Sequence, residues 1–383
     1  MQPGTTIFEQ MSGLARAHDA INLGQGFPDF GWPAAVLAAG ARAITSGDNQ
    51  YPPMRGLPEL RRAVAAFYRR RQGLDLDPDQ VIVTSGATEA LAASILSVAG
   101  PGDEVILFAP AYDAYAPLVR RAGAQPVFVD LAPPDWQADA SAITAAITPA
   151  TRAILLNTPH NPTGAMAGPA MLAAIVQLAR AHDLLIISDE VWEEVLTGAE
   201  PHVSPLALAP ERTIKIGSAG KLLALTGWKV GWVVAEAGLA ERVAQMHQFL
   251  TFTTPPPLQQ AVAEGLALPD AWFAATQGDF RRARDRLAAA LASGGWTLLP
   301  SVGSYFLMAD LAASGIGLSD SEFCMAAVAR AGVAAIPLGA FLPGTPASGF
   351  IRLCFAKRDT VLDAGASRLN AARRTDWAAM PGL

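Results

Sequence analysis

Short apolar runs alternate with helix-like stretches over the central part of the chain. The runs are rich in valine, isoleucine and leucine, and they show little polar alternation, which is typical of strands covered on both faces. Seven runs predict strands, at residues 81–84, 104–108, 126–129, 153–157, 184–188, 213–216 and 232–234. Helix-like segments separate several of them, at residues 87–99, 113–122 and 169–182. This order predicts an α/β fold with a mostly parallel seven-stranded sheet sandwiched by helices.

The C-terminal part of the chain has a different pattern, in which single strands and helices mix. A charged, alanine-rich helix is expected at 280–293, and further helices at 319–331 and 360–372. Strands are expected at 304–309, 332–336 and 350–355. The first forty residues are rich in proline and glycine, and we expect them to be irregular and to pack with this C-terminal part. The pattern predicts a large domain at 40–275 and a smaller α+β domain built from 1–39 and 276–383.

Composition and charge exclude several classes of protein. Hydrophobic residues make up 51% of the 383 residues and charged residues 16%, as in a folded protein. We find neither a membrane helix nor a secretory signal, and therefore expect a cytoplasmic protein without a membrane partner. The net charge of −6, without a basic run, argues against nucleic acid. Two cysteines and five histidines lack the spacing of a disulfide framework or a zinc site, so no metal is expected.

Small and polar residues follow the predicted carboxyl ends of five strands. In a parallel sheet these ends meet at one edge, where ligands bind. The segments that follow them are 85–88 (Ser-Gly-Ala-Thr), 110–112 (Pro-Ala-Tyr), 158–164 (Thr-Pro-His-Asn-Pro-Thr-Gly), Asp189 and 217–221 (Gly-Ser-Ala-Gly-Lys). We therefore expect amine, carboxylate, amide, hydroxyl and aromatic groups to gather at one site.

Lys221 is the strongest single candidate for chemistry. The chain holds 28 lysine and arginine residues in all, yet its lysines are confined to Lys215, Lys221, Lys229 and Lys357. A desolvated lysine can form an imine, which an arginine cannot. The alternative is a surface lysine at a helix start, which the positive end of the helix dipole disfavours. A nucleotide-binding loop is excluded, because Leu222 stands where that motif needs serine or threonine.

The other candidates each have a structural alternative. Asp189 could hold a protonated pyridine nitrogen, or it could cap a helix or form an ion pair. Asn161 could donate to a phenolate oxygen, or it could be a turn residue. Residues 85–88 could bind a phosphate at a helix start, or they could be an ordinary cap.

Three further residues carry groups that suit anions. Ser218 and Lys229 flank Lys221 and could add to a phosphate site, although a helix cap and a solvated strand edge explain them as well. Arg352 lies within an apolar strand, and a buried arginine needs a carboxylate. Few acidic residues lie nearby in the sequence, which favours a carboxylate supplied by a substrate.

Together these segments resemble the class I/II aminotransferases of the fold-type I pyridoxal-phosphate superfamily. The similar segments are 22–29 (Asn-Leu-Gly-Gln-Gly-Phe-Pro-Asp), 160–164, 189–191, 218–231 and 351–355. The chain is most similar to the branch of kynurenine/glutamine, methionine and N-succinyldiaminopimelate aminotransferases, and the resemblance covers nearly the whole chain. It implies the type I pyridoxal-phosphate transferase fold and a bound pyridoxal 5′-phosphate.

The resemblance also implies roles for single residues. Lys221 would form the Schiff base with the cofactor and carry the proton between the substrate Cα and the cofactor. Asp189 would pair with the pyridinium nitrogen, and Asn161 would donate to the ring oxygen. The residues implied to contact the rest of the cofactor are Tyr112, by stacking on the ring, and Ala87, Thr88, Ser218 and Lys229, by binding the phosphate.

Further implied roles concern the substrate and a second subunit. Arg352 would clamp the substrate carboxylate, helped by Asn161 and the backbone of Gly26. Tyr51 would reach the phosphate of a neighbouring subunit, so the resemblance implies a homodimer.

Trp192 departs from the family pattern, which usually has a tyrosine three residues after the aspartate, donating to the ring oxygen. An indole can donate a hydrogen bond, but it can neither accept one nor ionise. We therefore expect the imine between Lys221 and the cofactor to have a higher pKa than in relatives with tyrosine. Lys229 stands where many relatives have an arginine. A point charge therefore takes the place of a donor that can form two parallel hydrogen bonds.

The implied reaction is a ping-pong transfer of an α-amino group from an amino acid to a 2-oxo acid. The side-chain pocket is expected near Phe27, Phe252, Tyr305 and residues 7–8, which are mostly apolar and favour methionine, glutamine or aromatic donors. The alternatives are an N-succinyldiaminopimelate aminotransferase and a C–S β-lyase on the same scaffold. A non-catalytic binding protein is disfavoured by the complete set of candidate residues.

Overall fold

The computed structural model describes residues 6–344 and 348–377. At its centre is a seven-stranded sheet with the order β2-β8-β7-β6-β5-β3-β4. Its strands are β2 (Val81–Thr84), β3 (Glu104–Ala109), β4 (Gln125–Asp130), β5 (Thr151–Asn157), β6 (Leu185–Asp189), β7 (Thr213–Ser218) and β8 (Gly231–Val234). β8 runs antiparallel to β2 and β7, while the pairs from β7 to β4 are parallel. The prediction of a mostly parallel seven-stranded sheet is confirmed.

Helices cover both faces of this sheet. Successive residues of a strand point to opposite faces, and every residue of β2, β7 and β8 is buried. The helices of this part are α3 (Pro58–Gln72), α4 (Ala87–Val98), α5 (Tyr115–Arg121), α6 (Ala140–Ala145), α7 (Pro169–Ala181), α8 (Pro205–Leu208), α9 (Ala219–Leu222), α10 (Ala237–Leu250) and α11 (Pro256–Leu266). α4 packs on β6, β7 and β8, and α7 packs on β5.

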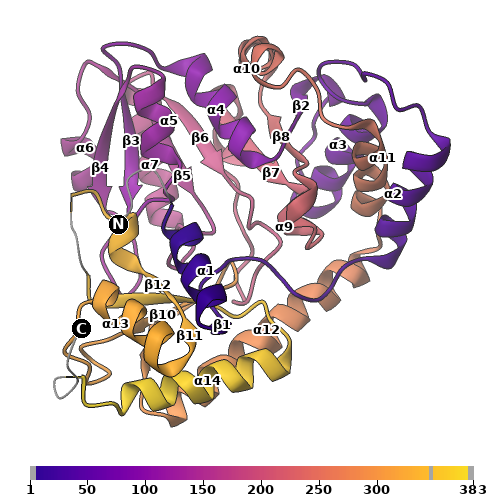
Figure 1. The fold of residues 1–383 in the computed structure, drawn as a ribbon. Coiled ribbons are helices and arrows are strands. Elements are labelled where there is room, and N and C mark those ends of the chain that lie inside the picture. The colour runs from indigo at the N-terminus through magenta and orange to yellow at the C-terminus, as the bar shows by residue number, and fades with distance from the viewer. Residues whose placement is uncertain (1–5, 345–347, 378–383) are drawn as a thin grey trace.

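A second sheet lies beside the first and comes from the end of the chain (Figure 1). Its order is β12-β13-β10-β9, with antiparallel neighbours throughout. Its strands are β9 (Thr297–Leu298), β10 (Phe306–Asp310), β12 (Ile336–Pro337) and β13 (Phe350–Cys354). The accompanying helices are α12 (Asp270–Ser293), α13 (Asp320–Ala326) and α14 (Asp359–Arg373). Arg352 is paired with Met308 on one side and Ile336 on the other, in the middle of this sheet.

The N-terminal segment corrects one expectation. Residues 6–40 are only partly irregular, because they include α1 (Ile7–Ala17) and the start of α2 (Ala34–Ser46), while residues 1–5 lie outside the described part. Between these helices, β1 (Ile21–Asn22) pairs with β11 (Val333–Ala334) of the C-terminal part.

Some predicted bounds also change. α12 begins at Asp270 instead of residue 280, and the strand expected at 332–336 is split into β11 and β12. The proposed domain boundaries at 39/40 and 275/276 fall within α2 and α12. The division into two domains therefore stays a prediction.

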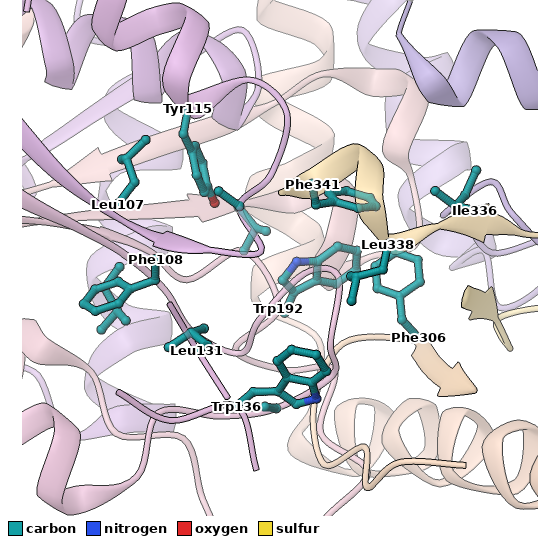
Figure 2. Close-up of a cluster of buried hydrophobic side chains, with 14 of the residues drawn as sticks. Leu107, Phe108, Tyr115, Leu131, Trp136, Trp192, Phe306, Ile336, Leu338 and Phe341 are labelled. Carbon is teal, nitrogen blue, oxygen red and sulfur yellow. The ribbon is translucent and has the colours of Figure 1, made fainter. Parts of the chain in front are cut away.

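One apolar core continues from the central sheet into the C-terminal part. In Figure 2, Tyr115 lies on the left, Ile336 lies on the right, and Trp192 lies between them beside Leu338 and below Phe341. All five side chains are buried. This core holds the edge of the central sheet against the C-terminal elements. Among the described helices, none combines the length and the hydropathy needed to cross a membrane.

Candidate active site

A cavity of about 160 Å³ lies at the carboxyl edge of the parallel strands. The predicted cofactor residues line it, with the exception of Tyr51. Its walls are formed by Gly86, Ala87, Thr88, Leu91, Tyr112, Tyr115, Asn157, Asn161, Asp189, Val191, Trp192, Ser218, Gly220, Lys221, Thr226 and Lys229. The structure therefore brings together residues that lie far apart in the sequence, while their roles stay predictions.

Lys221 lies in the short helix α9, directly after β7. Its Nζ donates to the hydroxyl of Tyr305 at 3.2 Å and lies 4.6 Å from the ring centre of Trp192. Burial lowers the pKa of Lys221 to about 8, because desolvation disfavours the ammonium. A considerable fraction of this amine is therefore neutral near physiological pH, as a nucleophile or base must be.

Asp189 ends β6 and is buried. The hydroxyl of Tyr115 donates to its Oδ2 at 2.6 Å, and the backbone N–H of Val191 approaches Oδ1 at 3.4 Å. Burial raises the pKa of Asp189 to about 6, although the bond from Tyr115 acts in the opposite direction. A protonated ring nitrogen in the cavity would supply the positive charge that this carboxylate lacks.

Asn157 connects the carboxyl ends of the neighbouring strands β5 and β6 at the cavity. Its Nδ2 donates to the backbone carbonyl of Asp189 at 2.9 Å, and its Oδ1 accepts from the backbone N–H of Asn161 at 2.8 Å. Asn161 is buried, and its own Oδ1 accepts from Arg352. The backbone positions of Asp189 and Asn161 are therefore set by the same amide.

Part of the cavity wall, formed by the start of α4, Ser218 and Lys229, suits an anion. α4 begins here after Gly86, which has a φ of 80° and offers no side chain to cap the helix. A Cβ built on Gly86 would lie 3.2 Å from the Nζ of Lys229, so the ammonium is close to the helix start. Ser218 precedes α9, and its side chain makes no capping bond. Free N–H groups, a helix dipole and an ammonium are groups that suit a phosphate, so the predicted phosphate site stays a prediction with matching chemistry.

Arg352 is held by the segment before α2 and by Asn161. It donates to Oδ1 of Asn161 at 2.7 Å and to the carbonyl of Gly24 at 2.8 Å, while its buried Nε has no partner. Its guanidinium lies 3.9 Å from the ring centre of Phe306. Burial lowers the pKa of Arg352 to about 10. Within residues 6–344 and 348–377 no carboxylate forms a contact ion pair with this cation, although the charge of Asp113 acts on its pKa from further away. The guanidinium is therefore available to an acidic ligand.

Three predicted residues are not among those that line the cavity, namely Arg352, Tyr51 and Gly26. Tyr51 is 84% exposed, and its ring packs edge-on against Phe252 with 5.8 Å between ring centres. Gly26 is linked to Lys221 through Tyr305, because the Gly26 carbonyl accepts from the Tyr305 hydroxyl at 2.7 Å and that hydroxyl contacts Lys221. A Cβ on Gly26 would come within 2.7 Å of the Phe306 ring, so this close approach requires glycine. The expected contact of Tyr51 with a second subunit stays a prediction.

Three residues of the site were missed from the sequence. Tyr115 begins the helix after β3, and Asn157 ends β5, so the strand-end argument contained a signal for both. Tyr305 was expected only as a wall of the side-chain pocket, whereas its hydroxyl contacts Lys221. No local sequence pattern predicts the contact between Lys221 and Tyr305, because the two residues are 84 positions apart.

Comparison with known proteins gives a consistent result over most of the chain. The family model of class I and II aminotransferases matches residues 18–369. A protein of Mycobacterium tuberculosis described as a probable N-succinyldiaminopimelate aminotransferase is 46% identical, with 96% of each chain covered. The methionine aminotransferase of Escherichia coli K12 is 42% identical, also with 96% of each chain covered. The solved structure of the Mycobacterium tuberculosis N-succinyldiaminopimelate aminotransferase has a TM-score of 0.93 at 45% identity, covering 96% of this chain and 97% of that one.

Proposed function

Because the chain belongs to the class I and II aminotransferases, we propose that it binds pyridoxal 5′-phosphate through Lys221. The enzyme transfers amino groups, and the proposal adds the cofactor, the residues and the kind of substrate. The observation that carries it is the amine of Lys221, which has a lowered pKa and faces a cavity with Asp189 and an anion site among its walls.

The residues present fit the chemical groups of this cofactor. Asp189 suits a protonated ring nitrogen, and the start of α4 with Lys229 suits a phosphate. Tyr112, Tyr115 and Trp192 are aromatic side chains that line the cavity together with Lys221. When bound, pyridoxal phosphate supplies an aldehyde that takes up amino groups and a ring that withdraws electrons from the substrate Cα.

The chain's own residues then have defined tasks. Arg352 binds the substrate carboxylate and so orients the Cα towards Lys221. The free amine of Lys221 removes the proton from the substrate Cα. It later delivers this proton to C4′, the carbon that carries the aldehyde of the cofactor. Asp189 keeps the ring nitrogen protonated through its negative charge.

We also propose that the enzyme works as a homodimer and that Tyr51 contacts the phosphate of the second subunit. In support, the strongly exposed Tyr51 and Phe249 and the partly exposed Leu250 and Phe252 are large apolar side chains. Such an exposed group of apolar residues is typical of an interface. A cytoplasmic location stays a prediction from the sequence.

The amino donor that we propose has an apolar or amide side chain, as in methionine, glutamine or the aromatic amino acids. The aromatic rings of Phe8, Phe306 and Phe341, all within 5.3 Å of the Arg352 guanidinium, support this. An N-succinylated diaminopimelate is the second candidate, because the relative with 46% identity carries that name. A C–S β-lyase activity on the same scaffold is the remaining alternative.

Two measurements test the proposal. Borohydride reduction of the holoprotein should fix the cofactor on the peptide that contains Lys221, and Lys221→Arg should abolish both this labelling and turnover. Mixing the holoprotein with single amino acids should change its visible spectrum only for true donors. Release of pyruvate and ammonia from a cysteine conjugate, without any 2-oxo acid, would indicate the lyase instead. Labelling at another residue would refute the role of Lys221.

A further inference from the structure

Tyr305 connects Lys221 with the N-terminal segment. Its side chain is fully buried, and its hydroxyl donates to the carbonyl of Gly26 at 2.7 Å. The Nζ of Lys221 lies 3.2 Å from the same oxygen. A tyrosine hydroxyl has only one proton, and the Gly26 carbonyl can only accept it. Towards Lys221 the oxygen is therefore an acceptor.

The position of this oxygen is fixed by core packing. The Tyr305 ring stands edge-on to Trp192, with 4.4 Å between ring centres and an interplanar angle of 85°. It also contacts the rings of Phe306 and Phe280, with centres 5.1 Å and 6.0 Å away. Interdigitated aromatic rings of this kind hold a single rotamer. The hydroxyl is thus a rigid acceptor next to a flexible amine.

We propose that Tyr305 is a positioning residue for the amino transfer, whose hydroxyl oxygen holds the amine of Lys221 whenever that amine is not covalently engaged. The inference rests on the proposed function, in which the amine is released from the cofactor before it moves the Cα proton. A free lysine side chain has four rotatable bonds, and each half-reaction would have to restrict them again. A fixed acceptor keeps the amine close to the place where it is needed.

The same contact links the amine to carboxylate recognition. Gly24, two residues before Gly26, accepts from the guanidinium of Arg352 at 2.8 Å. One short segment therefore contacts both Arg352 and, through Tyr305, Lys221. A Cβ on Gly26 would lie 2.7 Å from the Phe306 ring and 3.4 Å from the Tyr305 ring, so the segment is closely fitted. A shift of this segment on binding of a carboxylate would be passed to the lysine amine.

The electrostatic consequence can be measured. An acceptor oxygen stabilises an ammonium more than a neutral amine, so we expect the bond to Tyr305 to favour the charged form of Lys221, which burial disfavours. Tyr305→Phe removes only the oxygen and keeps the ring beside Trp192. We therefore expect the pKa of the Lys221 amine in this variant to lie about one pH unit lower, since hydrogen bonds to charged groups are among the stronger ones.

The experiment uses the holoenzyme in the amino form of its cofactor, in which Lys221 is free. Its amine is labelled with acetic anhydride at a series of pH values, and the labelled peptide is quantified by mass spectrometry. In Tyr305→Phe the midpoint should be lower by about one pH unit. The rate constant of the half-reaction should fall about tenfold or more, while half-saturation by the donor stays within about twofold.

Tyr68→Phe is the matched control. Tyr68 is also fully buried, but its hydroxyl contacts Glu193 and Trp232, at 2.8 Å and 2.9 Å, instead of Lys221. This variant should lose stability and leave the Lys221 midpoint and the half-reaction unchanged. A Tyr305→Phe protein with the wild-type midpoint and rate constant would overturn the proposal.

Borohydride labelling separates this inference from the proposed function. A Tyr305→Phe holoenzyme that still fixes its cofactor on Lys221 is folded and loaded, so its midpoint and rate report on the hydroxyl alone. If the wild-type protein itself fails to fix the cofactor there, the proposed function fails first. If Tyr305→Phe does not fold, replacement of Tyr305 by 3-fluorotyrosine keeps the ring and weakens the acceptor. A midpoint that then stays at the wild-type value would equally overturn the proposal.

Discussion

Lys215 lies at the centre of a group of buried charges directly behind Asp189. Its ammonium on β7 donates to Glu193 Oε2 at 2.6 Å and also contacts Glu190, the residue after Asp189. Glu190 in turn contacts Nε2 of His202 at 2.6 Å. The side chains of Lys215, Glu190 and Glu193 are fully buried, and that of His202 is 3% exposed. We expect Lys215→Met to be one of the most destabilising single substitutions in this enzyme.

The magnitude follows from the charges that remain. Removing one partner of a buried ion pair costs about 3–5 kcal/mol, because the other charge stays buried without compensation. Here two carboxylates lose the same ammonium. Burial already raises the pKa of Glu193 in the intact protein, and without Lys215 this pKa rises further. Glu193 then takes up a proton on folding, which relieves part of the cost at low pH.

The sign of the pH dependence follows from this proton uptake. A carboxyl group with a raised pKa in the folded state binds more protons when folded, so stability falls as the pH rises through that pKa. Urea unfolding at about pH 5.5 and about pH 8 should therefore show a larger loss for Lys215→Met at the higher pH. The double variant Lys215→Met with Glu193→Gln should regain much of the loss. A loss that is independent of pH, together with additive effects in the double variant, would refute this reasoning.

Three further predictions concern the site and its surroundings. Arg352→Lys keeps the charge but loses the two-pronged contact, so half-saturation by the amino donor should rise about tenfold or more in a stopped-flow half-reaction, and an unchanged value would contradict the carboxylate role. Burial opposes the charged form of His247, but its bonds to Glu89 at 2.5 Å and to the Met54 carbonyl at 2.9 Å outweigh this and raise its pKa. The stabilisation from these two bonds should be complete at a pH below the pKa of histidine in the unfolded chain, and it should disappear as the pH rises through the pKa of His247 in the folded protein. His247→Asn should lose this pH dependence of the free energy of unfolding. A variant with the wild-type pH profile would contradict the prediction. Trp192→Tyr should lower the midpoint of an absorbance titration of the holoprotein, and equal midpoints would refute the assigned role of the indole.

The central sheet could be predicted because its strands are covered on both faces and therefore appear as unbroken apolar runs. All seven predicted strands overlap those of the structure. The N-terminal helices were missed although a signal was present. Met11 and Ala15, four positions apart, form a buried face of α1, a helical spacing that the nearby prolines and glycines obscured. Local composition was given more weight there than periodicity.

The candidate site divides in a similar way. Lys221, Asp189 and Asn161 follow strands, so a rule about strand ends was sufficient to group them. The partner of the Lys221 amine could not be predicted, because Tyr305 reaches it from another sheet. Pairing between distant segments depends on how the two sheets pack, and a local pattern contains no information about that.

Burial is the common cause behind the unusual ionisation of the three main site residues. It lowers the pKa of Lys221 to about 8, raises that of Asp189 to about 6 and lowers that of Arg352 to about 10. In each case the charged form is disfavoured because the protein supplies too little opposite charge. A ring nitrogen cation for Asp189 and a substrate carboxylate for Arg352 would supply what is missing. In the free protein, the charged forms of Asp189 and Arg352 therefore carry an electrostatic cost that these ligands would remove on binding. The lowered pKa of Lys221 keeps part of its amine neutral, as its proposed role requires.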